Sequence, residues 1–101
     1  MVYKVVLSDR SIDDLKGICE YIAEHNSDAA HKLGYDILDQ IQSLSELPRR
    51  GRIYDQSNHN PAYEVPIRGY RTFYQINEAS KQVEVLHIRH SARSEPNVRA
   101  L

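Results

Sequence analysis

VPIRGYRTFYQI, residues 65–76, is the stretch of sequence that decides the fold. It contains two short runs rich in apolar and aromatic residues, and the dipeptide of Arg68 and Gly69 between them is typical of a tight turn. A third run of this kind follows the short connection 77–81. We therefore predict an antiparallel meander of three strands, at 62–67, 70–76 and 82–90.

Two helical patterns precede the meander. The first follows Ser8 or Asp9, either of which can cap a helix, and it breaks near His25. The second begins at Ser27, which can cap it, and Pro48 stops it. The apolar residues recur at steps of three and four, and they are Ile12, Leu15, Ile18, Cys19 and Ile22, then Ala30, Leu33, Ile37, Ile41 and Leu44. Because the joint between the patterns is short, we predict an antiparallel helical hairpin.

The remaining segments complete the predicted order of elements. Residues 1–7 are typical of a strand with at least one buried face. Residues 48–61 lack periodicity and are predicted to be a loop, with room for a brief strand around Ile53 and Tyr54, and residues 91–101 are predicted to be an irregular tail. We expect one α+β domain over 1–101, in the order β-α-α-β-β-β. The helical hairpin should cover one face of a small, mostly antiparallel sheet and leave the other at least partly open.

Composition limits the class of protein. The 101 residues, 41% of them hydrophobic, suffice for one core, and no apolar run approaches the roughly 20 residues that cross a bilayer. The N-terminal residues lack the pattern of a signal peptide, so we expect a soluble, cytoplasmic protein. Cys19 is the one cysteine, which excludes an internal disulfide, and we expect its thiol in the core. Gly34 marks close packing of the second helix against the first.

Charge is distributed unevenly along the chain. Residues 1–47 carry nine acidic and four basic residues, a net charge of −5, whereas residues 48–101 carry five acidic and nine basic residues, a net charge of +4. The total of −1 argues against broad nucleic-acid binding, because proteins that contact many phosphates are usually basic overall. The balance still permits a local basic patch.

Four motifs in order carry a resemblance to a known family. They are SIDDLKGICEYIA at 11–23, LSELPRRGR at 44–52, VPIRGYRTFYQI at 65–76 and VEVLHIRHSAR at 83–93. Together they resemble the ParE branch of the RelE/ParE toxin superfamily over nearly the whole chain. The resemblance implies a RelE/ParE-like fold and a bacterial type II toxin. Such a toxin is neutralised in a higher-order complex by an antitoxin encoded next to it. Relatives like RelE cleave mRNA on the ribosome, whereas ParE-like toxins inhibit DNA gyrase.

The set of residues that the ribonuclease activity needs is incomplete in this chain. Arg71 and Arg93 match arginines of RelE-like nucleases, but Arg99 stands where those enzymes have a tyrosine. His87 or His90 would have to be the base, and no glutamate can be aligned to pair with either. If the protein were a ribonuclease, the resemblance would assign catalysis to Arg71, His90 and Arg93. We therefore favour a gyrase-binding protein without catalytic residues. A ribonuclease, or a non-toxic member that retains antitoxin binding, remains an alternative.

The candidate binding site is a basic patch at the end of the predicted sheet, composed of Arg68, Arg71, Arg89, His90 and Arg93. We expect it to bind an acidic segment of the cognate antitoxin, the gyrase target, or both. Tyr63, Tyr70 and Tyr74 lie on the predicted strands, and two interpretations stay open. Either they pack the sheet, or their polar tips belong to a partly wet interface.

No metal or other cofactor is expected. His87 and His90 are three residues apart, and on a strand such residues point to opposite faces, so the pair cannot readily share one ion. We also expect neither membrane association nor direct sequence-specific binding of nucleic acid.

Overall fold

The computed structural model describes residues 2–55 and 60–90. Its elements are β1 (Lys4–Leu7), α1 (Asp9–Ala23), α2 (Ser27–Gln42), η1 (Ser43–Ser45), β2 (Arg52–Asp55), β3 (Ala62–Ile67), β4 (Tyr70–Asn77) and β5 (Gln82–His90). This is the predicted α+β order with one more strand, β2, at the place where a brief strand was allowed for. The predicted irregular tail, 91–101, lies outside the described residues.

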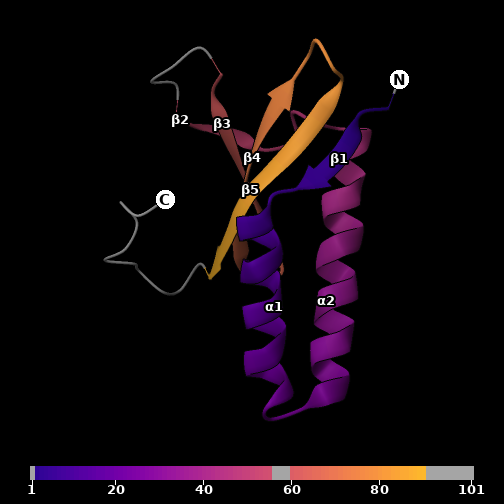
Figure 1. Cartoon of the computed structure of the whole chain (residues 1–101), viewed down its shortest axis with the longest axis vertical. Coiled ribbons are helices and arrows are strands. Elements are labelled where there is room, and N and C mark those ends of the chain that lie inside the picture. The colour runs from indigo at the N-terminus through magenta and orange to yellow at the C-terminus, as the bar shows by residue number, and fades with distance from the viewer. Residues whose placement is uncertain (1, 56–59, 91–101) are drawn as a thin grey trace.

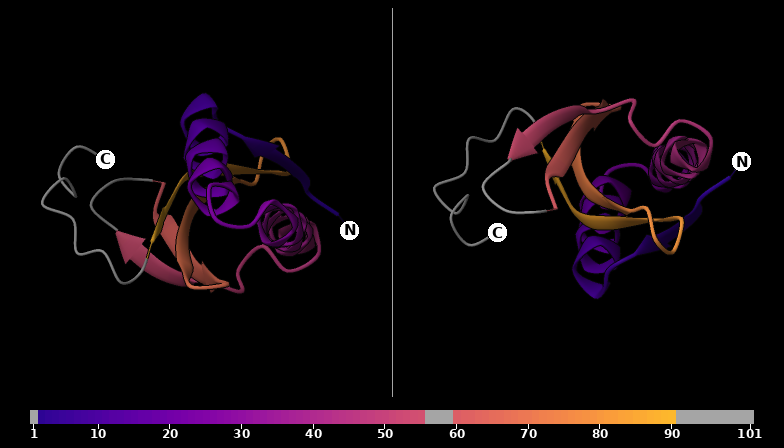
Figure 2. Two further views of the ribbon diagram at one scale, coloured as in Figure 1. Left: turned by 90° about the horizontal axis from the view of Figure 1, so that it is seen from below. Right: turned by 90° about the horizontal axis from the view of Figure 1, so that it is seen from above.

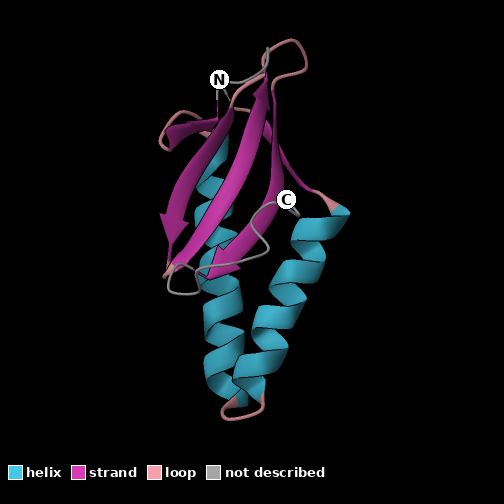
Figure 3. Ribbon diagram, turned by 90° about the vertical axis from the view of Figure 1, so that its left-hand side faces the viewer, coloured by secondary structure: helices cyan, strands magenta, loops and turns pink. Residues whose placement is uncertain are grey.

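The five strands form one sheet in the order β1-β5-β4-β3-β2 (Figure 1). β2, β3, β4 and β5 pair antiparallel, which confirms the meander, and β1 pairs with β5 in parallel. Both helices lie on the same side of the sheet (Figures 2 and 3), and the end of the hairpin extends past the sheet (Figure 3). In the described part of the chain, no helix is long and apolar enough to cross a membrane.

The start of α1 is tied to the sheet by its capping residue. The hydroxyl oxygen of Ser8 accepts a hydrogen bond from the backbone N–H of Ser11 at 3.1 Å and the hydroxyl itself donates to the carbonyl of Leu86 at 2.8 Å. The backbone N–H of Ser8 donates to the carbonyl of Val85 at 2.9 Å. Because one residue both caps the helix and bonds β5, α1 begins directly beside that strand.

The second helix is capped one residue earlier than predicted. The side-chain oxygen of Asn26, not Ser27, accepts the backbone N–H of Ala29 at 3.0 Å. The helix ends at Gln42 and continues as one tight turn, so it stops before Pro48 is reached. Its predicted apolar stripe is confirmed, because all five of its residues are buried: Ala30, Leu33, Ile37, Ile41 and Leu44.

The stripe of α1 is less completely buried. Ile12 is 42% exposed, and Cys19 is only partly buried, contrary to the expectation of a core thiol. The reason is the position of the helix, which lies along β5 at the border of the core and not over its centre. Gly34 does mark close packing, since a Cβ there would lie 3.1 Å from the sulfur of Cys19.

A bulge in β5 decides which side chains reach the face of the sheet away from the helices. Tyr74 is paired with Val85, but its neighbour Phe73 is paired with His87, so Leu86 is an extra residue in β5. The extra residue reverses the alternation of side chains along the strand. Val85 therefore packs in the core, whereas His87 stacks on Phe73 on the opposite face.

Candidate binding surface

The open face of the sheet carries a row of polar and aromatic side chains. Glu64 of β3, Phe73 of β4 and His87 of β5 are successive partners across three strands. Arg71 and Arg89 are a second cross-strand pair on the same face. Like charges placed directly opposite each other destabilise a sheet unless a counter-charge lies nearby. We call these five residues, with Arg52 and Tyr54 of β2, the open face.

Glu64 supplies that counter-charge. Its carboxylate accepts a hydrogen bond from the Nε of Arg71 at 2.5 Å and one from an amino group of Arg52 at 3.2 Å, while Glu64 itself is only 5% exposed. Burial acts to raise the pKa of Glu64, but the hydrogen bonds and charges of Arg71 and Arg52 outweigh it and hold the pKa below its ordinary value. Glu64 is therefore ionised at neutral pH and fixes the guanidinium of Arg71.

An aromatic cluster occupies the centre of the open face. The rings of Phe73 and His87 are stacked with centroids 4.5 Å apart, and Tyr54 meets Phe73 edge-on at 4.8 Å. The guanidinium of Arg71 lies 5.1 Å from the centroid of Phe73. Tyr54 remains 43% exposed, so the cluster is accessible from β2.

His87 is buried and neutral. Its Nδ1 has no hydrogen-bond partner in residues 2–55 and 60–90, and the residue is 7% exposed. Burial, together with the smaller effect of the charges of Arg10, Arg89 and Arg71, lowers the pKa of His87 to about 4. A neutral imidazole ring stacks on Phe73 without bringing another positive charge to this cluster of arginines.

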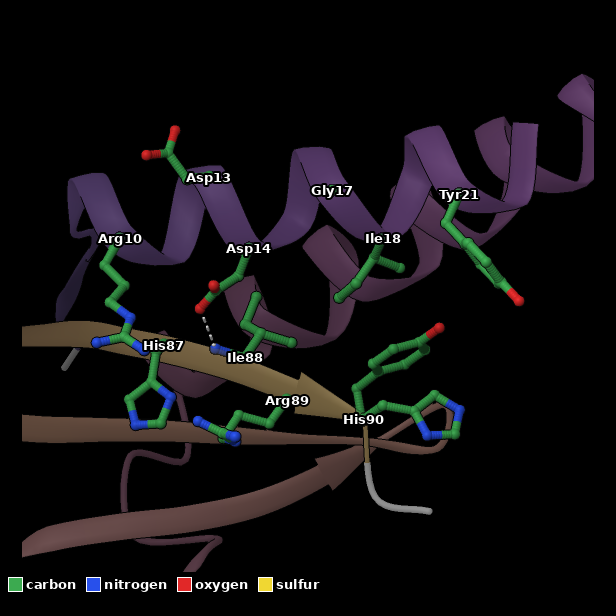
Figure 4. A pocket seen from close by; sticks show the side chains of 11 residues that line it. Arg10, Asp13, Asp14, Gly17, Ile18, Tyr21, His87, Ile88, Arg89 and His90 are labelled. Carbon is green, nitrogen blue, oxygen red and sulfur yellow. Dashed lines mark hydrogen bonds between the residues drawn. The ribbon is translucent and has the colours of Figure 1, made fainter. Parts of the chain in front are cut away.

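A cavity of about 480 Å³ lies between α1 and the end of β5 (Figure 4). Asp14 lies at one side of the cavity, where its carboxylate accepts a hydrogen bond from the backbone N–H of Ile88 at 2.9 Å. β1 pairs only with residues 82–85 of β5. Through Asp14, α1 provides a hydrogen-bond partner for the backbone of β5 beyond the part of its edge that β1 covers. We call this space the α1–β5 cavity, and it also borders the open face through His87 and Arg89.

An apolar groove lies between the two helices. It has a volume of about 330 Å³, and its lining includes Leu15, Cys19 and Leu38. Tyr35 at its border is 69% exposed. Burial raises the pKa of the Cys19 thiol in this groove.

The structure brings only part of the predicted basic patch together. Arg71 and Arg89 lie side by side on the open face. His90 lies on the helix side, where its ring meets that of Tyr70 at 5.1 Å. Arg68 lies in the β3–β4 turn with a positive φ of 53° and forms an ion pair with Asp36 of α2. Arg93 lies outside the described residues.

The predicted tyrosines mainly pack the sheet. Tyr70 and Tyr74 are buried in the core, and Tyr63 is stacked on Tyr74 with centroids 5.4 Å apart. The hydroxyl of Tyr74 also accepts the backbone N–H of Gly51 at 3.0 Å and donates to the carbonyl of Pro48 at 2.7 Å. The polar tip of Tyr74 thus fixes the loop after α2.

Several residues of the surface were not found from sequence. Glu64 and Tyr54 join this surface only because of the way their strands pair, which the local sequence does not show. Arg10, in the first turn of α1, lines the same two cavities as His87. The alternation in VEVLHIRH gave a partial signal, but the bulge at Leu86 moves His87 to the other face. Among residues 2–55 and 60–90, no three His, Cys, Asp or Glu side chains are grouped so as to hold a metal ion.

Two helices packed on one side of a mixed five-stranded sheet, with an open face opposite them, define the α+β fold of the RelE/ParE superfamily. A family model described as ParE toxin of type II toxin-antitoxin system, parDE, matches residues 5–95. The chain therefore belongs to the ParE toxin family.

Solved structures show the same fold at low sequence identity. A chain of the chromosomal ParDE toxin-antitoxin system from P. aeruginosa is 15% identical with a TM-score of 0.71, covering 88% of this chain and 96% of that one. A chain of the archaeal RelE–RelB complex from Pyrococcus horikoshii OT3 is 16% identical with a TM-score of 0.66, covering 93% and 100%. A chain of the RelBE2 toxin-antitoxin complex from Mycobacterium tuberculosis is 20% identical with a TM-score of 0.63, covering 92% of this chain and 95% of that one. No curated protein sequence matches the chain.

Proposed function

We propose that this ParE-family toxin inhibits DNA gyrase by binding it, and that a cognate antitoxin neutralises the toxin by covering the open face. Membership of the ParE family supports the proposal. So does the near-neutral chain, whose net charge of −1 suits a protein target better than bulk nucleic acid. The toxin would act in the cytoplasm, where gyrase is found.

The observation that carries the proposal is the state of Arg71. In the resemblance to RelE-like nucleases this arginine would contact phosphate, but here it is held by the buried carboxylate of Glu64 at 2.5 Å and lies over Phe73. Moving Arg71 onto a phosphate would leave Glu64 buried with only the exposed Arg52 as a partner, which is costly for an ionised group. The arrangement favours a fixed binding surface over a phosphate-binding centre.

The test is a supercoiling assay with purified gyrase and relaxed plasmid. We expect the wild-type protein to block supercoiling or to trap cleaved DNA, and Arg89→Ala and Arg93→Ala to weaken the effect. Arg49→Ala is the matched control, because Arg49 is an exposed arginine that pairs with Glu78 at the opposite end of β4. Unimpaired supercoiling at a large molar excess of folded toxin would reject gyrase as the target. Equal potency of all variants would reject this surface.

The antitoxin should present apolar residues at helical spacing together with acidic residues, which suit the aromatic cluster and the arginines of the open face. Because it would bind only the folded toxin, it should raise the melting temperature of the toxin by mass action. The measurement compares toxin alone with toxin co-expressed with the product of the adjacent reading frame. An unchanged melting temperature and an unchanged hydrodynamic size would reject this partner. Absence of such a reading frame would favour a non-toxic member of the family.

Ribosome-dependent mRNA cleavage is the second candidate function. One observation favours it: Glu64, Arg71 and His87 share the open face, and a neutral His87 is in the protonation state of a base. We nevertheless expect no cleavage in a translating extract, because the guanidinium of Arg71 is already engaged. Codon-spaced cleavage that is lost in both Arg71→Ala and His87→Gln would establish the ribonuclease instead.

A further inference from the structure

Each of the two helices contains one glycine, and packing accounts for only one of the two. Gly34 of α2 allows close packing, because a Cβ at this position would lie 3.1 Å from the sulfur of Cys19, closer than an ordinary contact. Gly17, in the middle of α1, has no such reason: apart from its chain neighbours and the backbone of α1 itself, a Cβ there would meet no atom of residues 2–55 and 60–90 within 4 Å. Glycine in a helix interior destabilises it relative to alanine. The described fold therefore bears a cost at Gly17 without a packing gain.

Gly17 lies at the α1–β5 cavity. The helix carries no side chain there, while Ile18, the next residue, and Tyr21, one turn further on, extend from the side of α1 that faces the strands (Figure 4). Tyr21 is 56% exposed and presents an aromatic ring with a polar tip beside the cavity. A bare stretch of helix next to an exposed tyrosine allows another polypeptide to approach the backbone of α1 closely.

The charges at this cavity indicate what kind of partner fits. Arg10 and Arg89 line it together with Asp13 and Asp14, so both signs are present. A nucleic acid would bring its phosphates close to the two carboxylates, which is unfavourable. A protein segment can present both charges and apolar groups, and an interface of this kind commonly has an aromatic anchor and a polar rim.

The cavity is also continuous with the open face. His87 and Arg89 belong to both, so a segment that covers the aromatic cluster can pass over the end of β5 and reach α1 without a break. We propose that the antitoxin follows this path and packs a backbone segment or a small side chain against Gly17, with Tyr21 as the anchor beside it. This inference rests on the proposed neutralisation by a cognate antitoxin.

Substitution of Gly17 should change stability and binding in opposite directions. Gly17→Ala adds a helix-favouring methyl group in open space, so the free toxin should melt higher, by about 4 °C. The same methyl group would keep the antitoxin from the helix, and we expect the dissociation constant to rise about tenfold, which equals about 1.4 kcal/mol. Gly17→Leu should raise it further. A substitution that only affects folding cannot stabilise the toxin and weaken its complex together.

The experiment uses the full-length toxin, recovered from its complex with the antitoxin of the adjacent reading frame and refolded. Titration calorimetry gives the affinity and a thermal melt gives the stability. Lys16→Ala is the matched control for an exposed neighbour outside the cavity, and it should leave the affinity unchanged. Gly34→Ala gains the same helix propensity but crowds Cys19, so it should raise the melting temperature of the free toxin less than Gly17→Ala does.

The outcomes separate the two proposals. If the wild-type toxin does not bind the antitoxin, the proposed function fails and the further inference fails with it. If the wild type binds and both Gly17 variants bind equally well, only the placement on α1 is overturned. A wild-type toxin that self-associates through a contact abolished by Gly17→Leu, with antitoxin affinity unchanged, would assign the site to a second copy of the chain and also overturn the proposal.

Discussion

Mild acid should destabilise this toxin through His87. The perturbation is a change from pH 7 to pH 5, which protonates an ordinary histidine but not one whose pKa is about 4. Because the folded-state pKa lies below the unfolded value of about 6.5, the unfolded chain binds the proton first as the pH falls. Stability should therefore decrease between about pH 6.5 and pH 4, and this loss should be complete below that window.

The size of the effect follows from the two pKa values. With about 6.5 for the unfolded chain and about 4 for the folded one, His87 alone accounts for a loss of about 2 kcal/mol between pH 7 and pH 5. This is an upper value, because any water reaching the ring would reduce the shift. Glu64 contributes little between pH 7 and pH 5: its pKa is lowered in the folded state, so the stability it provides is lost only as the pH falls below the ordinary carboxyl value.

Urea unfolding followed by circular dichroism at pH 7, 6 and 5 measures the loss. His87→Phe keeps a ring on Phe73 and removes the titrating group. Between pH 7 and pH 5, the free energy of unfolding of this variant should therefore decrease by about 2 kcal/mol less than the wild-type value does. His31→Gln removes an exposed histidine of α2 and should follow the wild-type profile. If His87→Phe lost as much stability as the wild type between pH 7 and pH 5, the reasoning about this buried imidazole would be refuted.

Three further substitutions test the packing that positions the surface. Tyr74→Phe should lower the free energy of unfolding by about 1–3 kcal/mol, because the Gly51 N–H and the Pro48 carbonyl lose their shared hydroxyl partner; an unchanged thermal melt would contradict this. Gly51→Ala should be more disruptive, since its Cβ would lie 2.6 Å from a backbone carbonyl oxygen, and a urea midpoint above that of Tyr74→Phe would count against it. Asp14→Ala should cost about 1–2 kcal/mol and speed amide exchange at Ile88, which loses its acceptor at 2.9 Å; slow exchange at Ile88 would disprove this link.

The periodic parts of this fold were predictable because they depend on local pattern. The stripe from Ala30 to Leu44 is buried as its spacing predicts, and the turn at Arg68 and Gly69 joins the two strands expected on either side of it. β2 was harder to predict, because all four of its residues are exposed and none of the usual alternation marks it.

The surface was less predictable because its geometry depends on distant pairing. One extra residue, Leu86, moves His87 to the open face, and no local pattern marks a bulge that is set by register with β4. The partner of Arg68 is Asp36, 32 positions earlier in the chain, so this arginine is held against α2 and away from the predicted patch. Arg71 and Arg89 were correctly grouped because they sit opposite each other in a predicted antiparallel pair.

The parallel pairing of β1 with β5 has a consequence for synthesis of the toxin on the ribosome. β5 is the last of the described strands to emerge, yet it lies between β1 and β4, with Lys4 beside Gln82. A nascent chain that has released the helical hairpin but not β5 cannot complete its sheet, and the contacts that remain to form are long-range and slow. The aromatic cluster and the α1–β5 cavity both need β5, so a partially synthesised chain presents neither. The parts of the surface that include His87 and Arg89 therefore form only after β5 has joined the sheet.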